Sequence, residues 1–191
     1  MTEIKADMDF KSIKKLVEAI TKEYKVRVGL LSGAGGAENI KDHDGKTNRD
    51  FDYAGLGALM EYGSDDGKIP ARSFLQMPLE QKQKEIISKT KMDYSTQELN
   101  YFLEKGKIDL MGMAIILGAN CVEAIQDAFD TQGFGQWTPN APSTIKKKGS
   151  SSPLIDTGAL RQKITAEIQT PQGTMYTGNK SSVGEYNEGQ G

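Results

Sequence analysis

The feature that most constrains the fold is one long apolar stretch between residues 108 and 130. Its apolar residues recur at intervals of three and four, which is the spacing of one face of an α-helix. Gly112 and Gly118 within it either allow another backbone to approach closely or only weaken the helix. We expect this helix at the centre of the core, with a buried face that consists of Leu110, Met113, Ala114, Leu117, Cys121, Ala124, Ile125 and Ala128.

The first third of the chain predicts a helix, a strand, a loop and a second helix. Apolar residues at helical spacing predict a helix over 10–24, and residues 25–31 alternate as a half-buried strand does. Residues 32–50 are rich in Gly, Asp and Asn and predict a loop. The apolar segment 53–62 predicts a short helix that ends at Gly63.

The remainder predicts more helices and then a second group of strands. Residues 69–75 should run extended, followed by a charged helix that ends near Asp93 and a further helix, capped by Ser95 or Thr96, that ends at Gly106. Residues 133–153 predict a loop, and 164–168 and 174–177 predict strands. We therefore expect an α+β fold with a small antiparallel sheet packed with several helices, and long loops. Residues 1–177 should form a single domain with its helical segment at about 74–131, and residues 178–191 a polar, flexible tail.

Composition narrows the classes of function. Only 37% of the residues are hydrophobic and 21 are Gly, which favours either burial against neighbouring subunits or a small domain with long loops. The formal net charge of −2 lacks the strongly basic balance of a protein that wraps nucleic acid. A ring through which DNA slides is compatible with it. The charged N-terminal residues 1–9 and the short apolar run 111–117 predict neither secretion nor a membrane span.

The residue types that usually carry catalysis are scarce, so we expect no catalytic residues, no metal site and no cofactor. His43 is the only histidine and lies in a turn-forming stretch, Lys41-Asp42-His43-Asp44-Gly45, where a metal site is conceivable but a solvated turn is favoured. Cys121 is the only cysteine and is expected to be a buried, inert thiol. The stretch Gly33-Ala34-Gly35-Gly36 lacks the Gly-Lys-Ser/Thr ending of a phosphate-binding loop.

A short basic run, Lys146, Lys147 and Lys148, is a possible partner contact. It could contact a phosphate backbone, form a solvated patch, or meet an acidic partner subunit.

Two segments carry the distinctive residues of the chain. The first runs from Ala54 to Leu75, with Glu61-Tyr62-Gly63 and then Ile69-Pro70-Ala71-Arg72-Ser73-Phe74-Leu75. The second runs from Trp137 to Ile164 and includes Ser143-Thr144-Ile145, Lys148-Gly149 and Pro153-Leu154-Ile155-Asp156-Thr157-Gly158.

In order and spacing, both segments resemble a family of bacteriophage virion-morphogenesis proteins, the neck and tail-completion proteins of long-tailed phages. Members typically show a Glu-aromatic-Gly turn, Ile-Pro-Ala-Arg-Pro-Phe-Leu, a Ser/Thr-Ile-Lys-Lys-Gly stretch and then Pro-Leu-Ile-Asp-Thr-Gly. The strand at 25–31 and the helix at 118–129 also look similar, so the resemblance covers about two-thirds of the chain. This chain departs from it at Ser73, where Pro is usual, and at Gln162-Lys163.

The resemblance implies a non-enzymatic structural protein of the virion, assembled in the host cytoplasm and located at the head–tail junction or in the tail. It would form a ring, of six or twelve copies by family analogy, and contact portal, adaptor or head-closure proteins on one side and tail-terminator or tail-tube proteins on the other. DNA would pass with passive contact, and no membrane is involved. The alternatives are a minor tail or tail-terminator protein, or a DNA-contacting packaging or stabilisation factor.

The motif residues have architectural roles in this interpretation. Glu61 can bind backbone donors or pair with Arg72, Pro70 stiffens the extended run, and Phe74 supplies apolar burial. Asp156 and Thr157 can cap the turn that begins at Gly158. For these three residues, the favoured interpretation is that they are fold determinants that contact no partner.

Overall fold

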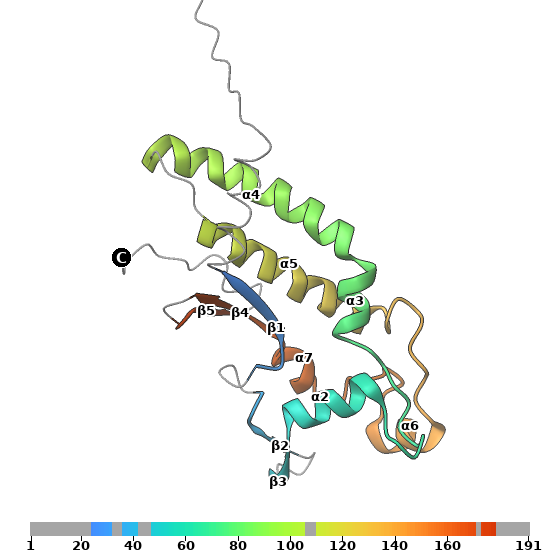
Figure 1. Cartoon of the computed structure of the whole chain (residues 1–191). Coiled ribbons are helices and arrows are strands. Elements are labelled where there is room, and N and C mark those ends of the chain that lie inside the picture. The colour runs from blue at the N-terminus through green and yellow to red at the C-terminus, as the bar shows by residue number, and fades with distance from the viewer. Residues whose placement is uncertain (1–23, 32–35, 42–46, 106–109, 171–172, 179–191) are drawn as a thin grey trace, which may run out of the picture.

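The computed structural model describes residues 24–31, 36–41, 47–105, 110–170 and 173–178 (Figure 1). The predicted α+β class is confirmed, because a small antiparallel sheet is packed with helices. The strands are β1 (Lys25–Gly29), β2 (Asn39–Lys41), β3 (Thr47–Asp52), β4 (Thr165–Thr170) and β5 (Gly173–Gly178). The helices are α2 (Tyr53–Tyr62), α3 (Gln76–Gln81), α4 (Gln83–Lys105), α5 (Leu110–Asp130), α6 (Pro142–Lys148) and α7 (Ala159–Gln162).

The main sheet joins the two ends of the described chain. Its strand order is β1-β4-β5, with both neighbours antiparallel, so β4 lies in the middle. Lys25 pairs with Gln169 and Gly29 with Thr165, whereas Gly178 pairs with Ala166. β1 therefore starts at one end of β4, and β5 finishes at the other end.

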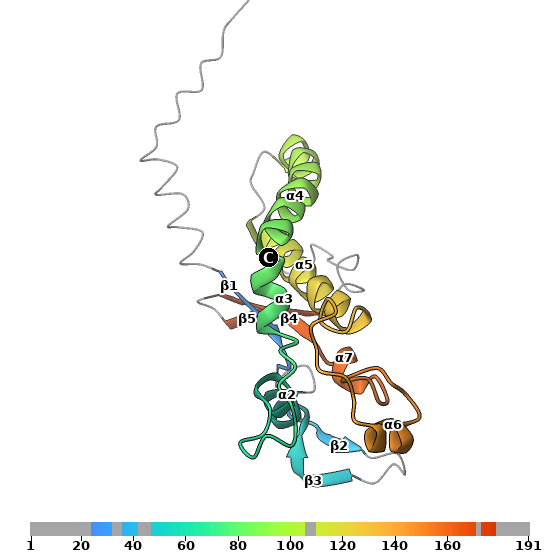
Figure 2. The ribbon, with the colours of Figure 1, turned by 90° about the vertical axis from the view of Figure 1, so that its right-hand side faces the viewer.

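Helix α5 covers one face of this sheet, and α4 lies on the outer side of α5 (Figures 1 and 2). The sheet comes so close that a Cβ at Gly118 would lie 2.8 Å from the Cβ of Ala166. Gly118 therefore permits close packing, one of the two roles that the sequence left open. On the other side of α5, the Asn120 amide donates to Thr90, and Lys89 pairs with Glu123 at 2.6 Å.

The position of α5 between two layers widens its buried face beyond the predicted stripe. Ala114, Ala124, Ile125 and Ala128 are buried as predicted. Leu110, Met113, Leu117 and Cys121 are only partly buried, while Ile115, Ile116, Val122 and Phe129 are buried in addition. By length and composition α5 could also cross a membrane, a property that core helices share, and here it packs on the sheet.

Three predictions about local structure were wrong. The predicted loop 32–50 contains β2 and the start of β3, which pair as an antiparallel hairpin. The two helices expected on either side of Asp93 form the single helix α4, because no Gly or Pro interrupts the run and Ser95 bonds the Met92 carbonyl within it. The predicted loop 133–153 contains α6, which Pro142 starts and the left-handed Gly149 ends.

Most of the other elements agree with the sequence, within the described residues. The strands at 25–29, 165–170 and 173–178 and the helix at 53–62 are present. Residues 69–75 form neither helix nor strand, and Leu75 already adopts helical backbone angles before α3, so the extended run predicted there is wrong at its C-terminal end. The predicted helix 10–24 falls almost entirely outside the described residues. So does the predicted tail, except for Gly178, which ends β5.

Candidate functional site

The two distinctive segments of the sequence meet below the main sheet, where side chains of one bond the backbone of the other. The Arg72 guanidinium donates through Nε to the Thr138 carbonyl at 2.7 Å and through Nη2 to the Pro139 carbonyl at 3.2 Å. In return, the Trp137 indole donates to the Ser73 carbonyl at 3.0 Å. Residues more than 60 positions apart thus form one interlocked unit.

The buried Glu61 carboxylate holds the start of α3. It accepts hydrogen bonds from the backbone amides of Phe74, Leu75 and Gln76 at 2.7, 2.9 and 3.0 Å. It also accepts one from the Ser73 hydroxyl at 2.6 Å. These amides belong to the helix N-terminus, which has no partners within the helix. Of the two roles expected for Glu61, the structure shows the backbone role, because Arg72 bonds the other segment instead.

Ser73, which departs from the family pattern, has a defined role here. Its hydroxyl donates to Glu61 and accepts from the Met77 amide at 2.9 Å. A proline at this position would supply neither bond, so the serine adds a second cap to α3.

Gly63 makes the turn between α2 and residues 69–75 possible. Its φ of +79° lies in the left-handed region, and a Cβ would approach the Ile69 carbonyl oxygen to 2.8 Å. The turn closes through the Ser64 amide, which donates to the Ile69 carbonyl at 2.9 Å. The backbone amide of Arg72 then bonds the Met60 carbonyl, which directs the guanidinium toward the second segment.

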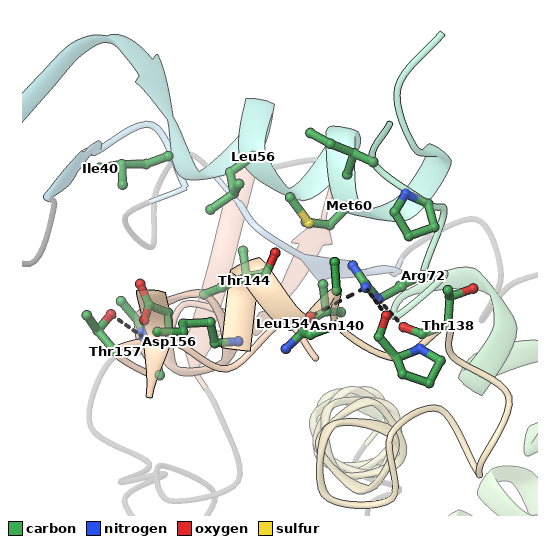
Figure 3. Close-up of a pocket in the computed structure, with 18 of the residues that line it drawn as sticks. Ile40, Leu56, Met60, Arg72, Thr138, Asn140, Thr144, Leu154, Asp156 and Thr157 are labelled. Atoms are coloured by element: carbon green, nitrogen blue, oxygen red, sulfur yellow. Dashed lines mark hydrogen bonds between the residues drawn. The ribbon is translucent and has the colours of Figure 1, made fainter. Parts of the chain in front are cut away.

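A cavity of about 520 Å³ lies between α2 and the segment that contains α6 and α7 (Figure 3). One wall carries apolar side chains from the hairpin and α2, including Ile40, Leu56 and Met60, and Leu154 faces them. The motif residues Pro70, Arg72, Lys148, Asp156, Thr157 and Gly158 also line it. The sequence motifs thus enclose one space.

The electrostatics of the cavity are dominated by cations. Among the described residues, the polar partners of the Arg72 guanidinium are carbonyl oxygens and the amide oxygen of Asn140, so no carboxylate balances its charge. Burial lowers the pKa of Arg72. Burial also lowers the pKa of Lys148, and repulsion from Arg72 adds to this while Asp156 opposes it.

The predicted cap at Gly158 is partly confirmed. Gly158 precedes α7 with a left-handed φ of +79°, and the Thr157 hydroxyl accepts from the Ala159 amide at 3.3 Å. The charge of Asp156 acts on Lys148 across the cavity wall.

The basic run, residues 146–148, lies on α6, and its three lysines differ in their exposure to solvent. Lys146 and Lys147 are exposed, whereas Lys148 is half-buried and donates to the Ser152 carbonyl at 2.7 Å. Only two of the three ammonium groups therefore face solvent.

The two stretches considered for a metal or a phosphate, 41–45 and 33–36, lie mostly outside the described residues. Within the described parts of the chain, no group of three His, Cys, Asp or Glu side chains could hold a metal ion. His43 and Gly33 to Gly35 lie outside those parts. Gly36 packs tightly, since a Cβ there would lie 2.5 Å from the Leu30 carbonyl oxygen.

Cys121 should react slowly with thiol reagents. Burial raises the pKa of its thiol to about 11 from 9.0. At pH 8 we expect its alkylation by iodoacetamide to be about 100-fold slower than in the urea-unfolded chain, because the thiolate is the nucleophile. The folded state should also lose stability as the pH rises from 9.0 to about 11, because only the unfolded thiol ionises in that interval. Equal rates in the folded and unfolded chains would contradict this assignment.

The comparisons with known proteins add no relative. No family model, no curated protein and no solved structure matches this chain.

Sequence reasoning missed several residues of this site. Asn140 links the segments, because it accepts from Arg72 and donates to the Ser151 and Ser152 carbonyls at 3.2 Å. Met60 and Leu56 line the cavity. The composition of the motifs pointed to none of these, although Asn140 stands between two prolines, where a side chain that bonds backbone is common.

Proposed function

We propose that this chain is a non-enzymatic structural subunit of a bacteriophage virion, in the neck or tail-completion region between head and tail. It would act by matching its neighbours through large interfaces in a ring, with portal, adaptor or head-closure proteins on one side and tail-terminator or tail-tube proteins on the other.

The observation that carries this proposal is the meeting of the two segments on which the family resemblance depends. Arg72 and Trp137 bind across from one segment to the other, and Glu61 fixes the turn between α2 and α3. A chance similarity of two short stretches gives no reason for them to contact each other. If the two stretches together determine the fold, their contact is expected.

The use of the buried charges supports a scaffold in preference to a reactive centre. The Glu61 carboxylate accepts hydrogen bonds from four donors, and Arg72 donates through Nε and Nη2 to the second segment. The Glu167 carboxylate in the central strand β4 accepts a hydrogen bond from Arg27 Nη1 at 3.4 Å and forms an ion pair with it. Each of these groups stabilises an internal contact, whereas a catalytic group needs an open position for substrate.

Particles purified from cells that produce this chain provide the test. We expect mass spectrometry to detect it in the particles and immunogold electron microscopy to place it at the head–tail junction or tail. Deletion of its gene should leave heads and tails unjoined, and the wild-type gene should restore infectivity. A chain absent from the particles, or full infectivity without the gene, would refute the proposal.

The DNA-contacting alternative depends on Lys146 and Lys147, the exposed pair on α6. If these residues held DNA, affinity for a duplex would fall steeply with salt, and Lys146→Ala with Lys147→Ala would flatten that slope by about two phosphate contacts. The structural proposal expects no measurable duplex binding at 150 mM salt, on the order of cellular ionic strength, so a titration by fluorescence anisotropy separates the two.

A further inference from the structure

The cavity between α2 and α6–α7 has the chemistry of a site for an acidic peptide. Of the charged residues that line it in the described part of the chain, Lys68, Arg72 and Lys148 are cationic and Asp156 alone is anionic. Lys68 already pairs with Asp66 at 2.8 Å, and the charge of Asp156 acts on Lys148, so the three cations exceed the two carboxylates that act on them. A carboxylate that entered the cavity would meet Arg72, which among the described residues bonds only carbonyl and amide oxygens, and Lys148.

The apolar wall argues against DNA as the occupant. A phosphate backbone is held by exposed cations along a groove. Here the cavity also presents the apolar side chains of Leu56, Met60 and Leu154, so a ligand that fits must place an apolar group beside its carboxylate (Figure 3). A free phosphate would leave most of the 520 Å³ unfilled.

The topology selects one segment of this chain as the occupant. β5 ends at Gly178, which pairs with Ala166, and β4 begins at Thr165 shortly after α7. Gly178, the last described residue, therefore lies at the end of the sheet where α7 borders the cavity. β1 begins at the opposite end of β4, so the residues before it start farther away.

The composition of that segment fits the cavity. Residues 179–191 contain Glu185 and Glu188 on either side of Tyr186, and a single cation, Lys180. From Gly178 to Tyr186 the chain can span about 26 Å when extended. We propose that residues 179–191 dock in this cavity, with Tyr186 against the apolar wall and the neighbouring glutamates toward Arg72 and Lys148. The inference rests on the cavity, the sheet topology and the sequence of residues 179–191, and it holds whether or not the chain is a phage protein.

A disulfide assay on the full chain tests the proposal. The pair Thr144→Cys and Asn187→Cys is placed in a Cys121→Ala background, because Thr144 lines the cavity from α6 and Asn187 follows Tyr186, which is kept intact. The matched control is Ser143→Cys with Asn187→Cys: Ser143 is the adjacent exposed residue and does not line the cavity. With oxidised glutathione as oxidant, we expect the Thr144 pair to close at least about tenfold faster, since docking raises the effective concentration of the thiols.

Two further measurements make the result decisive. Replacement of both glutamates, Glu185→Lys with Glu188→Lys, should reduce the rate of the Thr144 pair to that of the control. Non-reducing gels distinguish docking within one chain from exchange between copies, and either supports the proposal. Equal rates for the Thr144 and Ser143 pairs, with both chains folded by circular dichroism and both thiols open to maleimide, would overturn it and leave the cavity to another protein's segment.

Discussion

Replacement of Glu61 by glutamine should destabilise the fold by about 3 to 5 kcal/mol. The carboxylate is 6% exposed and accepts four hydrogen bonds, three of them from amides at the start of α3. Glutamine retains one acceptor oxygen but turns its NH₂ group toward donors, so at least two of these bonds are lost. Urea unfolding followed by circular dichroism measures the change.

The matched control for Glu61 is Glu80→Gln, an exposed glutamate on α3 itself. It removes the same charge at the surface, where substitutions usually change stability by less than about 0.5 kcal/mol. If the two variants unfold at the same urea concentration, the Glu61 carboxylate is not the element that holds α2 to α3.

The second large effect is expected at Phe74. Its side chain is fully buried and stands edge-on to Phe129 with ring centroids 5.5 Å apart, and Phe129 is in turn edge-on to Trp137 at 5.6 Å. Phe74→Ala should cost about 3 to 5 kcal/mol, through lost burial and the cavity that remains. This aromatic cluster joins residues 69–75 to α5 through Phe129 and to the second segment through Trp137. Removal of the Phe74 ring should therefore weaken the packing of residues 69–75 against α5 and against the second segment.

Two comparisons isolate the cause at Phe74. Tyr62→Ala removes an aromatic ring that is 75% exposed and should leave stability within about 0.5 kcal/mol. A double-mutant cycle of Phe74→Ala with Phe129→Ala should show a coupling of about 1 kcal/mol, as edge-on aromatic pairs do. Additive effects would mean that the two rings act independently.

Local patterns in the sequence identified most of the regular structure. Alternation at 25–31 and 164–168 predicted two strands of the sheet, and helical spacing predicted α5, because these periods reflect which side chains face the core. Gly63 ends α2 as predicted, since a left-handed residue after a helix favours glycine. The errors occurred at short elements. The β2–β3 hairpin has few apolar residues to reveal it, and α6 buries none of its side chains.

Some features of the site can likewise be read from the sequence, and others depend on the tertiary structure. The motif residues and their order can be read from the chain, and with them the architectural role of Glu61, because these depend on residues close in sequence. Whether Glu61 pairs with Arg72 or caps α3 depended on where Thr138 and Pro139 lie, more than 60 residues away. The cavity and its uncompensated guanidinium exist only after the two segments pack together. No local pattern encodes them, because the contacts that form them cross the whole fold.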